Sequence, residues 1–216
     1  HNLPRSVESL IGREREVGQL QALVAQHRLV TVTGPGGVGK SRLVIDGAWA
    51  FVDKFPDGVW LVELAALADP ALVAAAITAA LGVAVAPLAD ALWALKRQLG
   101  DRRLLMVLDN CEQVVGAVAD LADALIGACP GLRILATSRE PLRLEAETVI
   151  RLGLLALPAG ETVQAIGASP SVQLFVDRAV RRQPEFALDA ETAPIVAAIC
   201  RDLDGLPLAI ELAAGR

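Results

Sequence analysis

Cysteine is scarce in this sequence, and its spacing does not suggest a metal site. The chain has 216 residues and three cysteines, Cys111, Cys129 and Cys200. An odd number of cysteines without a C-x-x-C pair indicates neither a disulfide framework nor a thiolate metal site. Such usage is typical of a reducing compartment, so we expect a cytoplasmic protein.

Signals for secretion or membrane insertion are also lacking. The first residues contain no apolar signal core and no initiating methionine, so we expect a piece of a longer protein. The longest apolar stretch, residues 71–86, is shorter than the roughly 20 residues that span a bilayer. Asp69 and Pro70 before it are typical of a helix start. We therefore expect a buried helix over residues 71–86 and no membrane contact.

Positive charge is neither abundant nor concentrated. The chain has 20 Lys and Arg against 25 Asp and Glu, which gives a net charge of −5. The pairs Arg102–Arg103 and Arg181–Arg182 are too isolated to follow a phosphate backbone. We expect no direct contact between this segment and DNA.

What the sequence does contain is material for a packed core. Its 54% apolar and 21% charged residues exclude disordered and fibrous classes. Strand-like and helix-like segments alternate from about residue 10 to residue 152, which is typical of βα units around a mostly parallel sheet. The predicted strands cover residues 29–33, 59–62, 104–108 and 134–137, and a predicted amphipathic helix covers residues 112–129.

The pattern changes after residue 152, where the remaining periodicity is helical. We therefore predict a three-layer α/β domain over residues 1–155, a linker at about 155–168, and a small all-helical subdomain over residues 168–216.

A glycine-rich loop carries the strongest chemical signal. Residues 34–41 read G-P-G-G-V-G-K-S and match G-x-x-x-x-G-K-[ST] between a predicted strand and a predicted helix. The glycines let backbone N–H groups curl around phosphate oxygens at a helix start. Lys40 would reach the β- and γ-phosphates, and Ser41 would bind Mg²⁺. The predicted nucleotide-binding loop comprises Gly34, Pro35, Gly36, Gly37, Val38, Gly39, Lys40, Ser41 and Arg42.

Asp109 directly follows an apolar strand, at the edge where open α/β sheets bind ligands. With the glycine loop upstream, it is the expected Mg²⁺ partner, although alone it would read as a turn or cap residue. The next residue, Asn110, has no carboxylate to accept a proton from an attacking water, and the nearest acid is Glu112. The sequence therefore predicts slow hydrolysis.

Arg139 ends another predicted strand, after Thr137 and Ser138. Its guanidinium could contact a γ-phosphate and report its presence. The alternative is a surface arginine paired with Glu140 or Glu145. We predict that any catalysis rests on Lys40, Asp109, Glu112 and Arg139.

Five motifs occur in one order along the chain: Ile11–Glu14, the glycine loop, Val107–Glu112, Thr137–Arg139 and Gly205–Ala209. In order and spacing they resemble the NB-ARC type of STAND ATPases. More narrowly, the chain resembles the ATPase segment of large bacterial LuxR-like and AfsR-like transcriptional regulators. The resemblance spans almost the whole chain.

The resemblance implies a P-loop NTPase domain followed by a helical lid, with ATP or ADP in the cleft between them. It implies that Ile11, Gly12 and Arg13 line the adenine, that Pro207 packs against the base, and that Arg139 senses the γ-phosphate. Taken alone, the Gly12 and Pro207 segments would read as ordinary helix starts. The chain ends before the winged-helix subdomain whose histidine usually contacts the β-phosphate in this family.

The functional prediction is an ATP/ADP-dependent conformational switch in a multidomain signalling or transcription regulator, where binding energy rather than turnover carries the signal. Its partners would be the nucleotide, flanking domains and, depending on the nucleotide, a second copy. A fast ATPase or P-loop kinase, and a nucleotide-independent scaffold, stay as alternatives. The absence of an N-K-x-D tetrapeptide argues against a GTPase.

Overall fold

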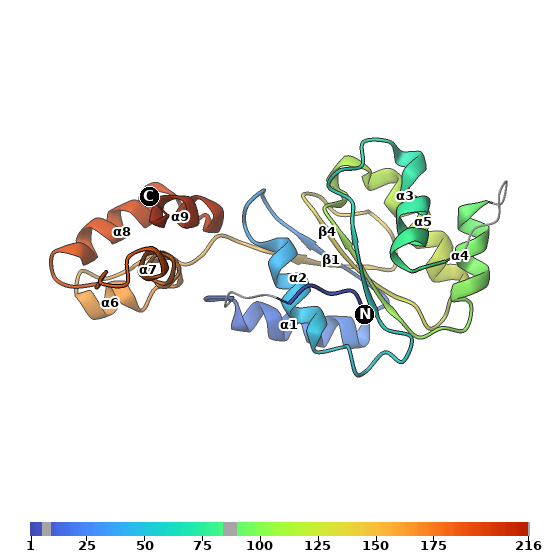
Figure 1. Ribbon diagram of the computed structural model, residues 1–216, viewed down its shortest axis with the longest axis horizontal. Helices are drawn as coiled ribbons and strands as arrows, with labels where there is room; N and C mark the ends of the chain where they lie inside the picture. The colour runs from blue at the N-terminus through green and yellow to red at the C-terminus, as the bar shows by residue number, and fades with distance from the viewer. Residues whose placement is uncertain (6–9, 84–89, 216) are drawn as a thin grey trace. The chain divides into compact units, whose positions relative to one another are not determined.

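The computed structural model describes residues 1–5, 10–83 and 90–215 (Figure 1). The chain falls into two compact units. The first unit contains residues 1–7, 16–34 and 40–151, and the second contains residues 8–15, 35–39 and 152–216. Each unit has an apolar core of its own.

The first unit is built on a five-stranded sheet whose neighbouring strands are all parallel. Its order is β2-β3-β4-β1-β5. The strands are β1 (Leu29–Thr33), β2 (Val59–Glu63), β3 (Leu105–Asp109), β4 (Arg133–Ser138) and β5 (Glu147–Arg151). Every residue of β1 and β3 is buried, because both faces of these strands are covered. The predicted α/β class with a mostly parallel sheet is confirmed.

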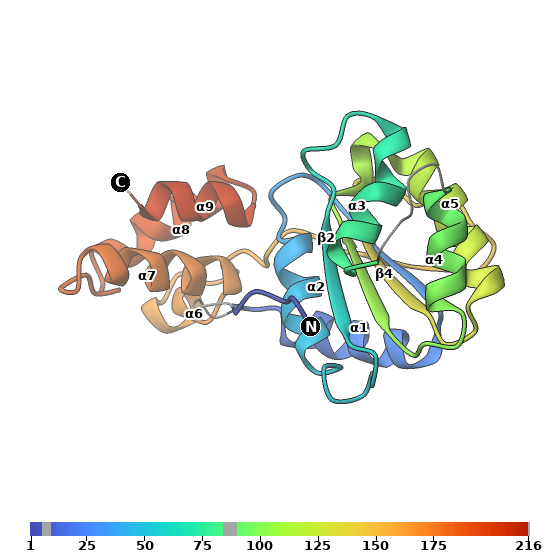
Figure 2. The same cartoon turned by 45° about the vertical axis from the view of Figure 1, so that its right-hand side comes forward.

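Helices cover both faces of this sheet and complete three layers (Figures 1 and 2). On one face α3, α4 and α5 share a core with the strands, in which Leu95, Met106 and Leu125 are fully buried. Helices α1 and α2 lie on the other face. The helices of this unit are α1 (Glu14–Gln26), α2 (Lys40–Trp49), the 3₁₀ turn η1 (Pro70–Leu72), α3 (Val73–Ala80), α4 (Ala91–Leu99), the 3₁₀ turn η2 (Cys111–Gln113) and α5 (Val115–Ala128).

The apolar stretch at residues 71–86 forms a shorter helix than the sequence predicts. Asp69 caps the 3₁₀ turn η1 that leads into helix α3, since its Oδ1 atom accepts the N–H of Ala71 at 2.9 Å. Helix α3 nevertheless ends at Ala80, and Gly82 then adopts φ +63°, a left-handed conformation that helices use to terminate. Residues 84–86 lie outside the described residues. None of the described helices is long and apolar enough to cross a membrane.

Strand β5 has no counterpart in the sequence prediction. It lies at the edge of the sheet beside β1, and only Ile150 is buried among its residues. An edge strand that is mostly solvated carries Glu147 and Arg151 at its ends and lacks the continuous apolar run that marks the central strands. The apolar pattern alone was therefore too weak to reveal it.

The second unit contains α6 (Val163–Gly167), α7 (Pro170–Arg182), α8 (Thr192–Asp202) and α9 (Pro207–Ala214). Its core is formed by apolar side chains that include Phe175, Val196 and Ile210. Helix α6 lies inside the stretch at residues 155–168 that the sequence predicts as a linker. Thr162 makes this short helix possible, since its Oγ1 atom accepts the N–H of Ala165 at 3.2 Å.

We expect Leu125→Ala to lower the free energy of unfolding of the first unit by about 2 to 5 kcal/mol, because its side chain is fully buried in the helix–sheet core. The matched variant Leu72→Ala, at a side chain that is 48% exposed, should change it by only about 0.5 kcal/mol. Trp49, Trp60 and Trp93 all belong to the first unit, so urea unfolding followed by tryptophan fluorescence measures that unit. Equal losses in the two variants would contradict this core.

Candidate functional site

The glycine loop connects β1 to α2 and requires glycine for its backbone. Gly37 has φ +76° and Gly39 has φ +95°, conformations that residues with a Cβ atom rarely adopt. At Gly39 a Cβ atom would meet nothing within 4 Å, so the backbone angle rather than space demands glycine there. At Gly37 a Cβ atom would also lie 2.9 Å from Cβ of Leu208. The sequence motif is thus explained by the shape of the loop.

Lys40 is the first residue of α2, and its side chain is buried. Its Nζ atom donates a hydrogen bond to the carbonyl oxygen of Gly34 at 3.0 Å, across the two ends of the loop. Burial lowers the pKa of Lys40; Glu112 and Asp109 oppose this effect, and Arg139 adds to it. A buried ammonium at a helix N-terminus is electrostatically unfavourable. An anion beside it would stabilise this arrangement.

Asp109 ends β3 next to β4, and its carboxylate is held by groups at this edge of the sheet. Its Oδ1 atom accepts a hydrogen bond from the hydroxyl of Thr137, a fully buried residue of β4. The Thr137 hydroxyl in turn accepts the backbone N–H of Asn110 at 2.9 Å, and Nδ2 of Asn110 donates to Oδ2 of Asp109 at 3.3 Å. Thr137 therefore orients the carboxylate. Its place just before Ser138 and Arg139 at a predicted strand end hinted at the site, but the sequence did not identify this role.

Asn110 adopts the left-handed conformation, with φ 60° and ψ 55°. Asparagine visits this region more readily than most residues because its short side chain bonds locally. The sharp turn leads directly into η2, which carries Glu112. The geometry of Asn110 is therefore a structural reason for an amide at this position.

Arg139 and Glu112 are paired with each other. Nε of Arg139 lies 3.3 Å from Oε1 of Glu112, and their side chains are 65% and 17% exposed. Glu140 pairs instead with Arg143. Oε2 of Glu112 is buried and has no hydrogen-bond partner among the residues that the structure describes. The arginine predicted to sense phosphate thus holds the acid predicted to orient water, a pairing that the sequence did not suggest.

The Ile11–Arg13 segment belongs to the second unit. Ile11 packs against that unit's core, and Gly12 has φ +67° with no room for a Cβ atom, which would lie 2.4 Å from Pro170. Arg13 is 4% exposed, and its Nη2 atom donates to the carbonyl oxygens of Gly153 at 2.6 Å and Val38 at 3.4 Å. Arg13 therefore supports the glycine loop, a role that the sequence did not predict.

Pro207 is the first residue of α9. The next residue, Leu208, donates its backbone N–H to the carbonyl oxygen of Gly37 at 3.2 Å within the second unit. Leu208 thus contacts the glycine loop directly. The Gly205–Ala209 motif led us to expect a role for Pro207 but not for Leu208.

Arg42 and Ser41 follow Lys40 in the first turn of α2. Arg42 lowers the pKa of Asp46, one turn along the helix, which burial raises more strongly. It also lines a pocket with Arg5 and Asp46. Arg42 therefore interacts electrostatically with Asp46. Lys40 instead interacts with Glu112, Arg139 and Asp109.

Comparisons with known proteins bear on the family of this chain. A family model described as novel STAND NTPase 1 matches residues 4–208. A putative HTH-type transcriptional regulator of Mycobacterium tuberculosis is 45% identical over 197 residues, which are 91% of this chain and 21% of that protein. The regulatory protein AfsR of Streptomyces griseus is 32% identical over 227 residues, covering 99% of this chain and 21% of that protein.

The chain spans about half the length of the curated mycobacterial relatives that match all 216 residues. Among solved structures, a signal transduction ATPase with numerous domains (STAND) and a tetratricopeptide repeat sensor, from Pyrococcus horikoshii, superposes with a TM-score of 0.62. At 16% identity, over 98% of this chain and 31% of that one, this likeness shows the fold alone. The family model, by contrast, matches nearly the whole chain, and such a match shows family membership. The chain belongs to the novel STAND NTPase 1 family.

Proposed function

We propose that this chain is an ATP/ADP-binding conformational switch within a multidomain regulator and that it hydrolyses ATP slowly. The observation that carries the proposal is the buried Lys40 ammonium at the end of the glycine loop. Loop N–H groups and a helix N-terminus favour phosphate, and the lysine supplies the positive charge. The family's description as an NTPase supports nucleotide as the anion.

Magnesium fits the residues of this edge, provided that the nucleotide supplies most of the ligands. No group of three or more His, Cys, Asp or Glu side chains suited to a metal occurs among the described residues. Mg²⁺ commonly uses one or two protein oxygens, water and substrate phosphates. We propose Ser41 and Asp109 as its protein partners, with Asp109 oriented by Thr137. The ion would neutralise phosphate charge.

Slow hydrolysis follows from the groups around Lys40. Asn110 has no carboxylate, and Glu112 is engaged by Arg139. Because Arg139 is 65% exposed, its pair with Glu112 contributes about 1 kcal/mol or less, whereas a charge-assisted hydrogen bond to phosphate contributes roughly 1.5 to 3 kcal/mol. A γ-phosphate would therefore replace Glu112 as the partner of Arg139. After the ion pair is subtracted, about 0.5 to 3 kcal/mol remains, which corresponds to roughly a 2- to 150-fold population change between the ATP and ADP states.

The setting of the switch is a larger protein. The matching regulators are several times longer than this chain, and their descriptions name transcriptional regulation. We propose that flanking domains sense the signal and deliver the output in the cytoplasm, that self-association depends on the nucleotide, and that this segment does not contact DNA itself. We propose that residues 1–155 form one domain and that residues 168–216 form a helical lid. The residues that would face the adenine are Ile11, Gly12, Arg13 and Pro207.

Two alternatives remain testable. A fast ATPase or P-loop kinase would need a carboxylate directly after Asp109 to activate the nucleophile, and that position holds Asn110. A nucleotide-independent scaffold would have no use for a buried lysine in a glycine loop. The three experiments below separate these alternatives from the switch.

We expect Lys40→Ala to weaken ADP and ATP binding by about 10- to 150-fold, because it removes a charge-assisted hydrogen bond to phosphate. Isothermal titration calorimetry in the presence of Mg²⁺ measures the affinity. Lys96→Ala, a change at a lysine in the last turn of α4, serves as the control and should bind like the parent chain. Unchanged affinity in Lys40→Ala would contradict the assignment of the loop and favour the scaffold.

Steady-state turnover at saturating ATP should lie below about 1 per second, the low end of common enzyme rates. Phosphate release measures it, with Glu112→Gln as the test variant and Glu140→Gln as the control. Glu140 is also paired with an arginine, so the control matches the change in charge. Brisk turnover that Glu112→Gln abolishes and Glu140→Gln preserves would establish an enzyme instead of a switch.

Hydrogen exchange across residues 155–215 should differ between the ATP-analogue and ADP states, since only the analogue offers a γ-phosphate to Arg139. Arg139→Ala should erase the difference and leave ADP affinity within about twofold, because ADP lacks that phosphate. Arg143→Ala, at an arginine that pairs with Glu140, is the matched control and should retain the difference. Identical exchange profiles in the two states of the parent chain would show that this segment lacks the switch.

A further inference from the structure

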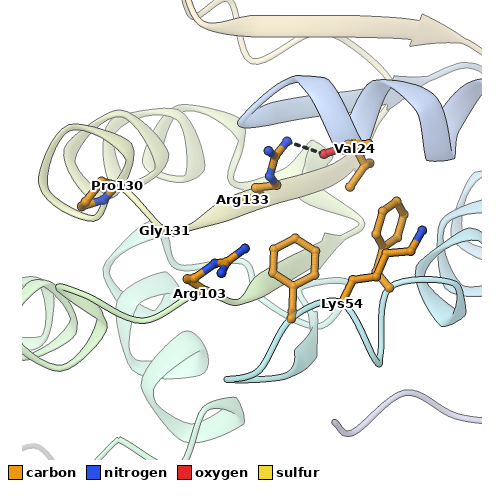
Figure 3. A pocket seen from close by; sticks show the side chains of 9 residues that line it. Val24, Lys54, Arg103, Pro130, Gly131 and Arg133 are labelled. Carbon is orange, nitrogen blue, oxygen red and sulfur yellow. Dashed lines mark hydrogen bonds between the residues drawn. The ribbon is translucent and has the colours of Figure 1, made fainter.

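A second cationic site lies at the opposite edge of the sheet from Lys40. It is a pocket of about 290 Å³ whose walls include Val24, Phe51, Lys54, Phe55, Arg103 and Arg133 (Figure 3). Arg103 precedes β3, and Arg133 is the first residue of β4, so the pocket lies at the amino ends of these strands. Asp109 ends the five-residue β3, which puts the two sites roughly 16 Å apart at about 3.3 Å per residue.

The pocket concentrates positive charge. Lys54, Arg103 and Arg133 line it, and none of the lining residues that the structure describes is acidic. Asp57, whose Oδ2 atom accepts the backbone N–H of Arg103 at 2.7 Å, lies beside the pocket but does not line it. The site therefore brings cationic side chains together without a lining carboxylate to neutralise them.

Arg133 is the anchored member of this group. Its Nη1 atom donates to the carbonyl oxygens of Val24 and His27, at the end of α1, at 2.5 and 2.8 Å. Nε and Nη2 have no hydrogen-bond partner among the described residues, which leaves donors for a ligand. Burial lowers the pKa of Arg133, and the charges of Arg28 and Arg103 add to that effect. Helix capping explains Arg133 alone, but it does not explain why Arg103 is held near it.

The remaining wall is aromatic. The ring centroids of Phe51 and Phe55 lie 6.0 Å apart at an interplanar angle of 58°, and Nζ of Lys54 lies 5.0 Å from the centroid of Phe51. Two arginine forks suit an anionic oxygen group, and the partly exposed ring of Phe55, backed by the buried Phe51, suits a flat apolar body. A pocket of this volume accommodates a single ring.

We propose that this pocket binds a small aromatic anion, a phosphomonoester on a single ring, with Arg103 and Arg133 on the phosphate and the partly exposed Phe55 beside the ring. A dianionic phosphate balances the charge of Lys54, Arg103 and Arg133 better than a monoanion does. The site is separate from the nucleotide loop, so its occupation does not depend on the function proposed above.

The test is a titration of the 216-residue chain with phenyl phosphate, observed by ligand NMR, with Mg²⁺ and saturating ADP present. We expect saturable binding at millimolar concentrations or below. Methyl phosphate, which has the same charge but no ring, and inorganic phosphate should each bind at least about tenfold more weakly. The same titration in Lys40→Ala should give the same affinity, because that lysine lies at the other edge.

Arg103→Gln should weaken phenyl phosphate binding by about tenfold or more, because it removes a charge-assisted contact from an exposed position that does not support the core. Lys54→Gln should also weaken binding. Arg102→Gln, the exposed neighbour outside the lining, is the matched control and should bind as the parent does. No measurable binding, equal binding of inorganic phosphate, or full affinity in Arg103→Gln would each overturn the proposal.

Discussion

The parallel pairing of β1, β3 and β4 is the constraint on which the candidate site depends. Parallel strands bring their carboxyl ends to one edge, so the residues that follow or end them meet there although they are far apart in sequence. Thr33 pairs with Ser138 in the register of β1 and β4, and Asp109 closes β3 on the other side of β4. Asp109, Glu112 and Arg139, which act electrostatically on Lys40, all follow or end strands of this arrangement.

The close packing of two cationic and two acidic side chains gives this edge its chemical character. Lys40 is buried at a helix start, and Arg139 lies close enough to lower its pKa further. The acids of the edge are already engaged, Asp109 by Thr137 and Glu112 by Arg139. In our proposal an anionic ligand with several oxygens, a nucleotide, would contact Lys40 and Arg139 together. At the amino ends of β3 and β4, Arg103 and Arg133 form a second cluster of positive charge.

Local signals were sufficient for much of the fold and part of the site. The glycine loop, the apolar run before Asp109 and the cap at Asp69 each depend on residues close in sequence, and the structure has all three features. The edge strand β5 and the early end of α3 were missed or misjudged, because a solvated strand has little apolar pattern and an alanine-rich stretch does not mark its own end. Register and edge position come from neighbours, not from propensity.

The sequence by itself determined which backbone shapes are allowed: a loop with left-handed glycines, a lysine at the following helix start, and a carboxylate at the end of a buried strand. Only the tertiary structure decided which groups meet. Thr137 orients Asp109, Arg139 pairs with Glu112 rather than with its sequence neighbours, and Arg13 bonds the carbonyl of Val38. These contacts join residues on separate elements, and their formation depends on the packing of the sheet and core as a whole, which no local pattern encodes.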